Sequence, residues 1–131
     1  MKKSMGTINS KELGFLAENI ASRFLISKGY EIVERNYRKP WGEIDIIAKK
    51  CSAIFFIEVK ANRQSYSSGF DPEVRVNNKK MSKIIKTASL YMGDGKMTKL
   101  GWQIDIISVT FDELRKKANV KHIKNVGEDF I

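Results

Sequence analysis

The chain has 131 residues, of which 42% are hydrophobic and 30% are charged, and its formal net charge at pH 7 is +9. This length suffices for one hydrophobic core but not for two of ordinary size, so we expect residues 1–131 to form a single domain. One cysteine and one histidine cannot form a disulfide or a structural zinc site, and no stretch approaches the ~20 apolar residues that span a bilayer. We therefore expect a protein of the reducing cytoplasm that does not enter a membrane.

The positive charge is unevenly distributed along the chain. Residues 1–40 carry +4 (eight basic, four acidic), and residues 75–99 carry +6 (seven basic, one acidic). Residues 41–74, between them, carry −1 (four basic, five acidic). Basic segments around an acidic one suit a protein that attracts a polyanion and holds carboxylates within its binding surface. A lysine-rich solvated surface explains the charge equally well, so charge alone does not decide.

The first third of the chain predicts one helix followed by strands. The helix is expected to begin with Ser10 as its cap and to end at Gly29. Its apolar stripe consists of Leu13, Leu16, Ala17, Ile20, Ala21, Phe24 and Leu25. Strand-like runs follow at residues 31–37, 43–49 and 53–60.

The remaining elements complete an α-β-β-β-α-β order. A second helix is expected over residues 77–92 and a buried strand over 102–109, followed by a short helix at FDELRKK (111–117) and an edge strand at NVKHIKNV (119–126). Residues 1–9 indicate a flexible N-terminus, and the polar residues 61–73 indicate a mobile loop. This order predicts an α/β fold with a mixed central sheet flanked by helices.

Two carboxylates occupy corresponding places in the runs EIDIIAK and AIFFIEVK. A hairpin that turns at residues 51–52, with a loop of two or four residues, places Asp45 opposite Glu58. The same register places Glu43 opposite Lys60. Cys-Ser is not a favoured two-residue turn, so we expect the loop to have four residues.

Period-two alternation divides the side chains of this hairpin between two faces of the sheet. One face carries Glu43, Asp45, Phe56, Glu58 and Lys60, and the other carries Ile44, Ile46, Phe55, Ile57 and Val59. Opposed carboxylates repel each other, and a divalent cation that takes oxygen ligands, such as Mg²⁺, would reverse the sign of that interaction. The alternative is a set of charges on a solvated face. The apolar Phe56 on the same face argues against this alternative.

Lys60 completes a set of groups suited to phosphodiester hydrolysis. That reaction needs a positioned water and neutralisation of the charge that grows on the phosphoryl oxygens. A lysine two residues beyond Glu58 suits both tasks. The alternative role for Lys60 is an ion pair with Glu43 across the hairpin.

Asp45, followed thirteen positions later by Glu58-Val59-Lys60, resembles the signature of the PD-(D/E)xK nuclease superfamily, which has the same α-β-β-β-α-β core. More narrowly, the chain resembles the YraN-like family of small bacterial proteins, which is placed in that superfamily. The matching residues are Gly14, Ala17, Glu18, Ala21, Leu25, Gly29, Tyr30, Arg35, Asn36, Arg38, Gly42 to Asp45, Phe56 to Lys60, Lys80, Ala88, Tyr91 and Asp105. The resemblance covers the chain from about residue 13 onwards and implies a restriction-endonuclease-like fold.

The resemblance also implies roles in catalysis and metal binding. Asp45, Glu58 and the Val59 carbonyl would bind Mg²⁺ or Mn²⁺, and Glu18 would bind the metal or one of its waters. Lys60 would orient or activate the attacking water. Glu18 lies at the border of the helix stripe, so its alternative role is that of an ordinary border glutamate.

Basic residues near this set are candidates for contacts with nucleic-acid phosphates. The candidates are Arg35, Arg38, Arg63, Lys80 and Lys83. Lys80 lies at the edge of the second helix's buried stripe, whereas Lys83 points away from it. Arg63 stands next to Asn62, where the family often has an arginine. Arg35 and Arg38 also fit a solvated turn.

Four other residues receive a structural interpretation. Asp105 is expected to be a buried aspartate that satisfies backbone N–H groups, and His122 to be exposed. Trp41 and Trp102 are expected to pack in the fold, although Trp41, beside the proposed site, is also a candidate for stacking on a base.

Together these features predict a metal-dependent nuclease that acts on DNA, including branched intermediates of repair or recombination. The first alternative is a nucleic-acid-binding module that keeps the scaffold without turnover, and the second is a structural or protein-interaction role. A chain this small that acts on two strands is expected to form a homodimer.

Overall fold

The computed structural model describes residues 8–64, 77–93 and 100–128. Its elements in chain order are α1 (Ser10–Ser27), β1 (Glu31–Lys39), β2 (Gly42–Lys50), β3 (Ala53–Arg63), α2 (Asn78–Gly93), β4 (Gly101–Asp112) and β5 (Lys117–Ile123). The predicted α/β class and α-β-β-β-α-β order are confirmed. The predicted mobile loop over 61–73 begins inside β3, and the rest of it, from residue 65, lies outside the described residues, as do residues 1–7 of the predicted flexible N-terminus.

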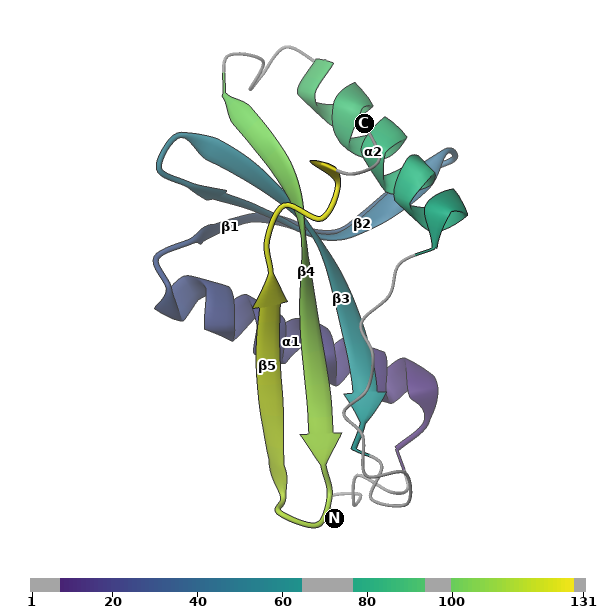
Figure 1. Ribbon diagram of the computed structural model, residues 1–131, viewed down its shortest axis with the longest axis vertical. Helices are drawn as coiled ribbons and strands as arrows, with labels where there is room; N and C mark the ends of the chain where they lie inside the picture. The colour runs from purple at the N-terminus through teal and green to yellow at the C-terminus, as the bar shows by residue number, and fades with distance from the viewer. Residues whose placement is uncertain (1–7, 65–76, 94–99, 129–131) are drawn as a thin grey trace.

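The five strands form one mixed sheet in the order β1-β2-β3-β4-β5 (Figure 1). Strands β3 and β4 are parallel, and the other three neighbouring pairs are antiparallel. This topology makes β3 the centre of the sheet and places β5 at an edge, as the sequence predicts. No helix in the described part of the chain is both long and apolar enough to cross a bilayer.

Each helix covers a different set of buried sheet residues. The cluster under α1 includes Leu13, Ala17, Ala21, Leu25, Ile46, Ile57, Ile107 and Val109. The cluster under α2 includes Ile44, Ile47, Ile54, Phe56, Met81, Ile84, Ala88 and Ile104. Burying a Leu, Ile, Val, Phe or Met side chain contributes about 1.5–3 kcal/mol, so these two layers of contacts hold the helices onto the sheet.

Two apolar residues differ from the predicted pattern. Ile44 was expected on the face of Ile46 and Ile57, but it packs in the α2 cluster because the first half of β2 turns away with β1. Leu16 was expected in the buried stripe of α1 but is 37% exposed. The contact stripe of α1 is narrower than predicted, since it follows a four-residue spacing from Leu13 to Leu25.

The cap of α1 is Asn9 rather than Ser10. The Asn9 side-chain oxygen accepts a hydrogen bond from the Glu12 backbone N–H at 2.8 Å, and the Asn9 amide donates to the Glu12 carboxylate at 2.9 Å. Asn and Ser are comparable caps, so this reciprocal pair explains why the helix starts one residue earlier. At the other end Gly29 adopts a φ of 90°, as expected of the residue that ends the helix.

The loop between β2 and β3 has two residues, not the four predicted. Lys50 pairs with Ala53, and Cys51 and Ser52 have positive φ values of 49° and 61°. Positive φ at both central residues is the type I′ geometry that matches the twist of a hairpin. The requirements of the strands therefore outweigh the poor turn preference of Cys-Ser.

The segment FDELRKK forms no helix, which corrects that prediction. Phe111 and Asp112 are buried at the end of β4 and pair with the start of β5, and residues 113–116 make the turn. The Asp112 carboxylate accepts the Arg115 N–H at 3.0 Å within this turn. Burial of Phe111 in the α1 cluster overrides the local helical pattern.

Replacing the turn residues by Cys51→Asn together with Ser52→Gly should raise the free energy of unfolding by about 1 kcal/mol, because Asn and Gly tolerate positive φ. Urea denaturation measures the change. Ser82→Gly in α2 is the matched control and should lower stability by about 0.5 kcal/mol, because glycine weakens a helix. A destabilising Asn-Gly turn would contradict the two-residue hairpin.

Candidate functional site

Strands β2 and β3 separate at the point where the two acidic residues lie. Their ladder runs from Lys50 with Ala53 to Ile46 with Ile57, which confirms the predicted register. It ends one pair before Asp45 and Glu58, so these residues are not directly opposed on paired strands as expected. Beyond this point β2 continues beside β1, and β3 continues beside β4 (Figure 1).

Asp45 fills the gap that this separation leaves. Its Oδ2 accepts a hydrogen bond from the Val59 backbone N–H at 2.8 Å. Burial, and next the charge of Glu58, raise the pKa of Asp45 to about 7, although the Val59 N–H opposes this rise. Val59 thus enters the site through its N–H, and Asp45 is a carboxyl group that can bind or release a proton near neutral pH.

Glu58 is the buried acid of the site, with a side chain that is 7% exposed. The ammonium group of Lys80, from α2, forms an ion pair with Glu58 Oε1, and the Lys60 Nζ lies 4.0 Å from the same oxygen. The structure therefore brings Glu58, Lys60 and Lys80 together. The proposed pair of Lys60 with Glu43 is replaced by an Arg38–Glu43 pair at 3.6 Å.

The two lysines have opposite pKa shifts. Burial lowers the pKa of Lys60, and the neighbouring charge of Lys80 lowers it further. Burial alone would also lower the pKa of Lys80, but its hydrogen bond to Glu58 and the charges of Glu58 and Asp45 together outweigh burial, and the net shift is upward. Lys80 therefore remains the charged partner of Glu58, while Lys60 is the lysine that gives up a proton more easily.

Glu18 reaches this region from α1. Burial raises the pKa of Glu18, Arg35 and Arg38 oppose the rise, and Glu43 and Glu58 add to it. Among the described residues, Glu18 Oε1 and the Nε and Nη2 of Arg35 are buried without a hydrogen-bond partner. Buried polar atoms of this kind are uncommon and typical of positions where water or a ligand binds.

The donor set fits a divalent cation held by two carboxylates. No group of three or more His, Cys, Asp or Glu side chains within the described ranges is placed to hold a metal ion. Mg²⁺, however, commonly uses one or two carboxylates and keeps its remaining ligands as water. Asp45 and Glu58 supply such a pair, and the unpartnered oxygen of Glu18 lies within electrostatic reach of both.

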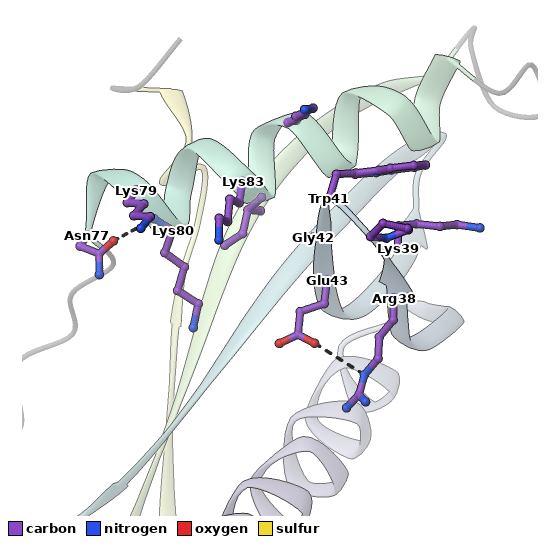
Figure 2. A pocket seen from close by; sticks show the side chains of 12 residues that line it. Arg38, Lys39, Trp41, Gly42, Glu43, Asn77, Lys79, Lys80 and Lys83 are labelled. Carbon is purple, nitrogen blue, oxygen red and sulfur yellow. Dashed lines mark hydrogen bonds and ion pairs between the residues drawn. The ribbon is translucent and has the colours of Figure 1, made fainter.

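The remaining basic candidates are dispersed. Lys83 lines a groove between the β1–β2 turn and α2, and Arg38 lines it too, beside Glu43 (Figure 2). Arg63 lies two residues beyond Ala61 in β3, so its side chain points to the same face of the sheet, where Ala61 packs against the α1 cluster. Arg63 also donates a hydrogen bond to the Ile8 carbonyl. Arg63 therefore lies on the sheet face opposite that of Lys60.

The structure corrects the interpretation of His122. Its side chain is 9% exposed, and its Nε2 lies 2.8 Å from the Asp105 carboxylate. Asp105 also accepts the Asn125 N–H at 2.9 Å, which confirms its role as a buried acid that satisfies the backbone. Burial would raise the pKa of Asp105, but the bonds from His122 and Asn125 lower it. The apolar alternation of β5 was the sequence signal for an inward His122.

The two tryptophans differ in environment. Trp102 packs edge-on against Phe56 with ring centroids 5.6 Å apart, as predicted for a packing residue. Trp41 is 40% exposed and lines the groove, so its packing role is smaller than expected. The groove itself was missed, although the run RKPWG (38–42) carried its aromatic and basic residues.

These features define a small mixed α/β protein with two acids and two lysines gathered where adjacent strands separate. A family model described as "Uncharacterised protein family UPF0102" matches residues 17–109. A UPF0102 protein of Fervidobacterium nodosum is 39% identical over 99% of this chain and 94% of its own length. UPF0102 proteins of Campylobacter fetus subsp. fetus and Clostridium botulinum (strain Loch Maree) are each 42% identical, over 87% and 88% of this chain and 92% and 94% of their own lengths. The chain belongs to the UPF0102 family, which confirms the YraN-like resemblance.

Asp45→Asn should stabilise the protein at about pH 8. The folded-state pKa of Asp45, about 7, lies above its ordinary value of 3.8, so the folded state binds more protons between these values and stability falls as the pH rises. Asparagine keeps an acceptor for the Val59 N–H without the charge. Allowing for solvent screening, we expect a gain of about 1–2 kcal/mol that shrinks towards pH 4.

Denaturant unfolding across this pH range measures the effect, and carboxyl ¹³C shifts report the titration of Asp45 directly. Glu43→Gln removes an exposed acid and should change stability by no more than about 0.5 kcal/mol. A loss of stability in Asp45→Asn at about pH 8 would contradict the raised pKa of Asp45.

Proposed function

We propose that this protein is a divalent-metal-dependent nuclease of the PD-(D/E)xK superfamily that hydrolyses phosphodiester bonds in DNA. The observation that carries the proposal is the meeting of Asp45, Glu58 and Lys60 where β2 leaves β3. Burial, and next the charge of Glu58, raise the pKa of Asp45, and the Lys60 Nζ lies 4.0 Å from a Glu58 oxygen. A mutually repelling pair of acids beside a lysine suits a site that works with a cation and a phosphate.

The chain's own groups would divide the work of hydrolysis. Asp45 and Glu58 would hold Mg²⁺ or Mn²⁺, with Glu18 near enough to bind the metal or one of its waters. The bound metal would act as a Lewis acid on a phosphoryl oxygen and make a water more acidic. Lys60 would orient or deprotonate that water, a task that its lowered pKa favours. The Val59 N–H would keep the Asp45 carboxylate in place.

Charge and topology support DNA as the substrate. Helix α2 carries four lysines, and all of them line the groove: Lys79, Lys80, Lys83 and Lys86. Contacts of this kind bind a phosphate backbone without reading bases, which suits a nuclease that recognises structure, such as a branched repair or recombination intermediate. Cutting both strands of a duplex would need two copies of this site, hence a homodimer.

One observation favours the alternative of a nucleic-acid-binding module without turnover. The Lys80 ammonium occupies the Glu58 oxygen that a metal would need. In such a module Lys80 would neutralise Glu58 permanently, and the acids would serve only to hold the strands and α2 in place.

Cleavage assays with flaps, junctions, single strands and duplexes separate the two proposals. With Mg²⁺ or Mn²⁺ we expect cutting of at least one substrate, and a loss of about 100-fold or more in Asp45→Asn, Glu58→Gln and Lys60→Ala. Lys121→Gln, an exposed lysine on the edge strand β5, is the matched control and should retain activity. Binding without any metal-dependent cutting would favour the module, and absence of binding would favour a structural role.

A further inference from the structure

A basic groove of about 760 Å³ runs between the β1–β2 turn and α2 (Figure 2). The turn contributes Lys39, Trp41 and Gly42, and α2 contributes Lys79, Lys80 and Lys83. Lys80 belongs to the groove and also pairs with Glu58. Lys80 therefore links the groove to the proposed catalytic centre, and the groove is wide enough for a small organic group.

The charge of the groove is one-sided. Six lysine or arginine residues line it, and the single acidic lining residue, Glu43, is already paired with Arg38 at 3.6 Å. Arg38 and Glu43 are mostly exposed, so their pair offsets little of the field. The remaining lysines make a site for a polyanion rather than for a neutral ligand.

Trp41 gives the groove an aromatic surface. The side chain is 40% exposed, and neither hydrophobic cluster of the described residues includes it. Figure 2 shows the indole ring extended along α2 rather than turned into the core. An exposed indole among lysines is the combination that binds a base by stacking and its phosphates by charge.

The position of Trp41 is fixed by the close packing of its neighbour. A Cβ added to Gly42 would collide with Thr87 Oγ1 and would lie 3.3 Å from the Lys83 carbonyl. Only glycine lets the turn approach α2 this closely. The aromatic surface and the lysines of α2 are therefore held together before any ligand arrives, which lowers the entropic cost of binding.

We propose that this groove binds an unpaired nucleotide of a nucleic-acid strand, with its base stacked on Trp41 and its flanking phosphates on Lys79 and Lys83. Inside a duplex both faces of each base are covered by neighbouring bases, so an internal paired base cannot stack on Trp41. The groove thus selects single-stranded segments next to the scissile bond. This inference deepens the proposed nuclease function and rests on it for the role of the strand as substrate.

Binding of a short oligothymidylate of about ten nucleotides, in EDTA, tests the groove without any cleavage. In a Trp102→Phe background Trp41 is the only tryptophan, and its fluorescence should be quenched by the oligonucleotide but not by a blunt duplex of the same length. Trp41→Ala should weaken oligonucleotide binding about fivefold or more and change duplex binding little. Circular dichroism melting of each variant confirms that it folds.

Salt dependence tests the lysines separately. Lys83→Gln should lower the slope of log affinity against log salt by about 0.7, the value for one phosphate of a single strand, whereas Lys121→Gln on β5 should leave the slope unchanged. Equal affinity of wild type and Trp41→Ala for the oligonucleotide, or equal quenching by the duplex, would overturn the inference.

The failure of this inference is distinguishable from failure of the nuclease proposal. Metal-dependent cutting together with unchanged binding in Trp41→Ala would keep the nuclease and reject the groove. Trp41-dependent binding without cutting of any substrate would keep the groove as a single-strand site and reject the nuclease.

Discussion

The site depends on how one backbone N–H is satisfied where β2 leaves β3. In a continuing antiparallel ladder the Val59 N–H would face a carbonyl of β2, but pairing ends at Ile46 and Ile57. The Asp45 carboxylate takes that place at 2.8 Å. A buried N–H without a partner costs about 1–3 kcal/mol, so the acid stabilises the separated strands. The same bond fixes the carboxylate beside Glu58. The separation of β2 from β3 and the placement of Asp45 beside Glu58 therefore depend on the same hydrogen bond.

The second constraint is the burial of Glu58. A buried carboxylate is strongly unfavourable unless a cation pairs with it, and here Lys80 fills that position from α2. The arrangement ties α2 to the central strand and raises the pKa of Lys80, whereas burial, and next the charge of Lys80, lower the pKa of Lys60. Among the described residues no cation forms an ion pair with Asp45, and burial, with the charge of Glu58 next, raises its pKa to about 7. This uneven division gives the site one compensated acid and one that titrates near neutrality.

The sequence predicted what local periodicity encodes. Alternation along 43–49 and 53–60 determined the register from Ile46 to Lys50, because a slip of one residue would expose the buried isoleucines. It did not predict that the ladder stops before Asp45, since strand separation depends on α2 packing against β2 and on the close approach of Gly42 to Thr87. The helix predicted at 111–117 failed for a similar reason: Phe111 is placed by the core, not by its neighbours in sequence.

Lys80 connects the groove to the acids and thereby links the two proposals. Its ammonium group cannot fully compensate Glu58 and a phosphate in the groove at the same time, so a strand bound as proposed would compete with Glu58 for it. Weakening of the Lys80–Glu58 pair would leave Glu58 less fully compensated, with Lys60 4.0 Å away, and the two acids would attract a divalent cation more strongly. By thermodynamic reciprocity, a cation at the acids would also favour the strand in the groove by the same factor. In the proposed nuclease, the metal site is therefore completed when a strand is bound.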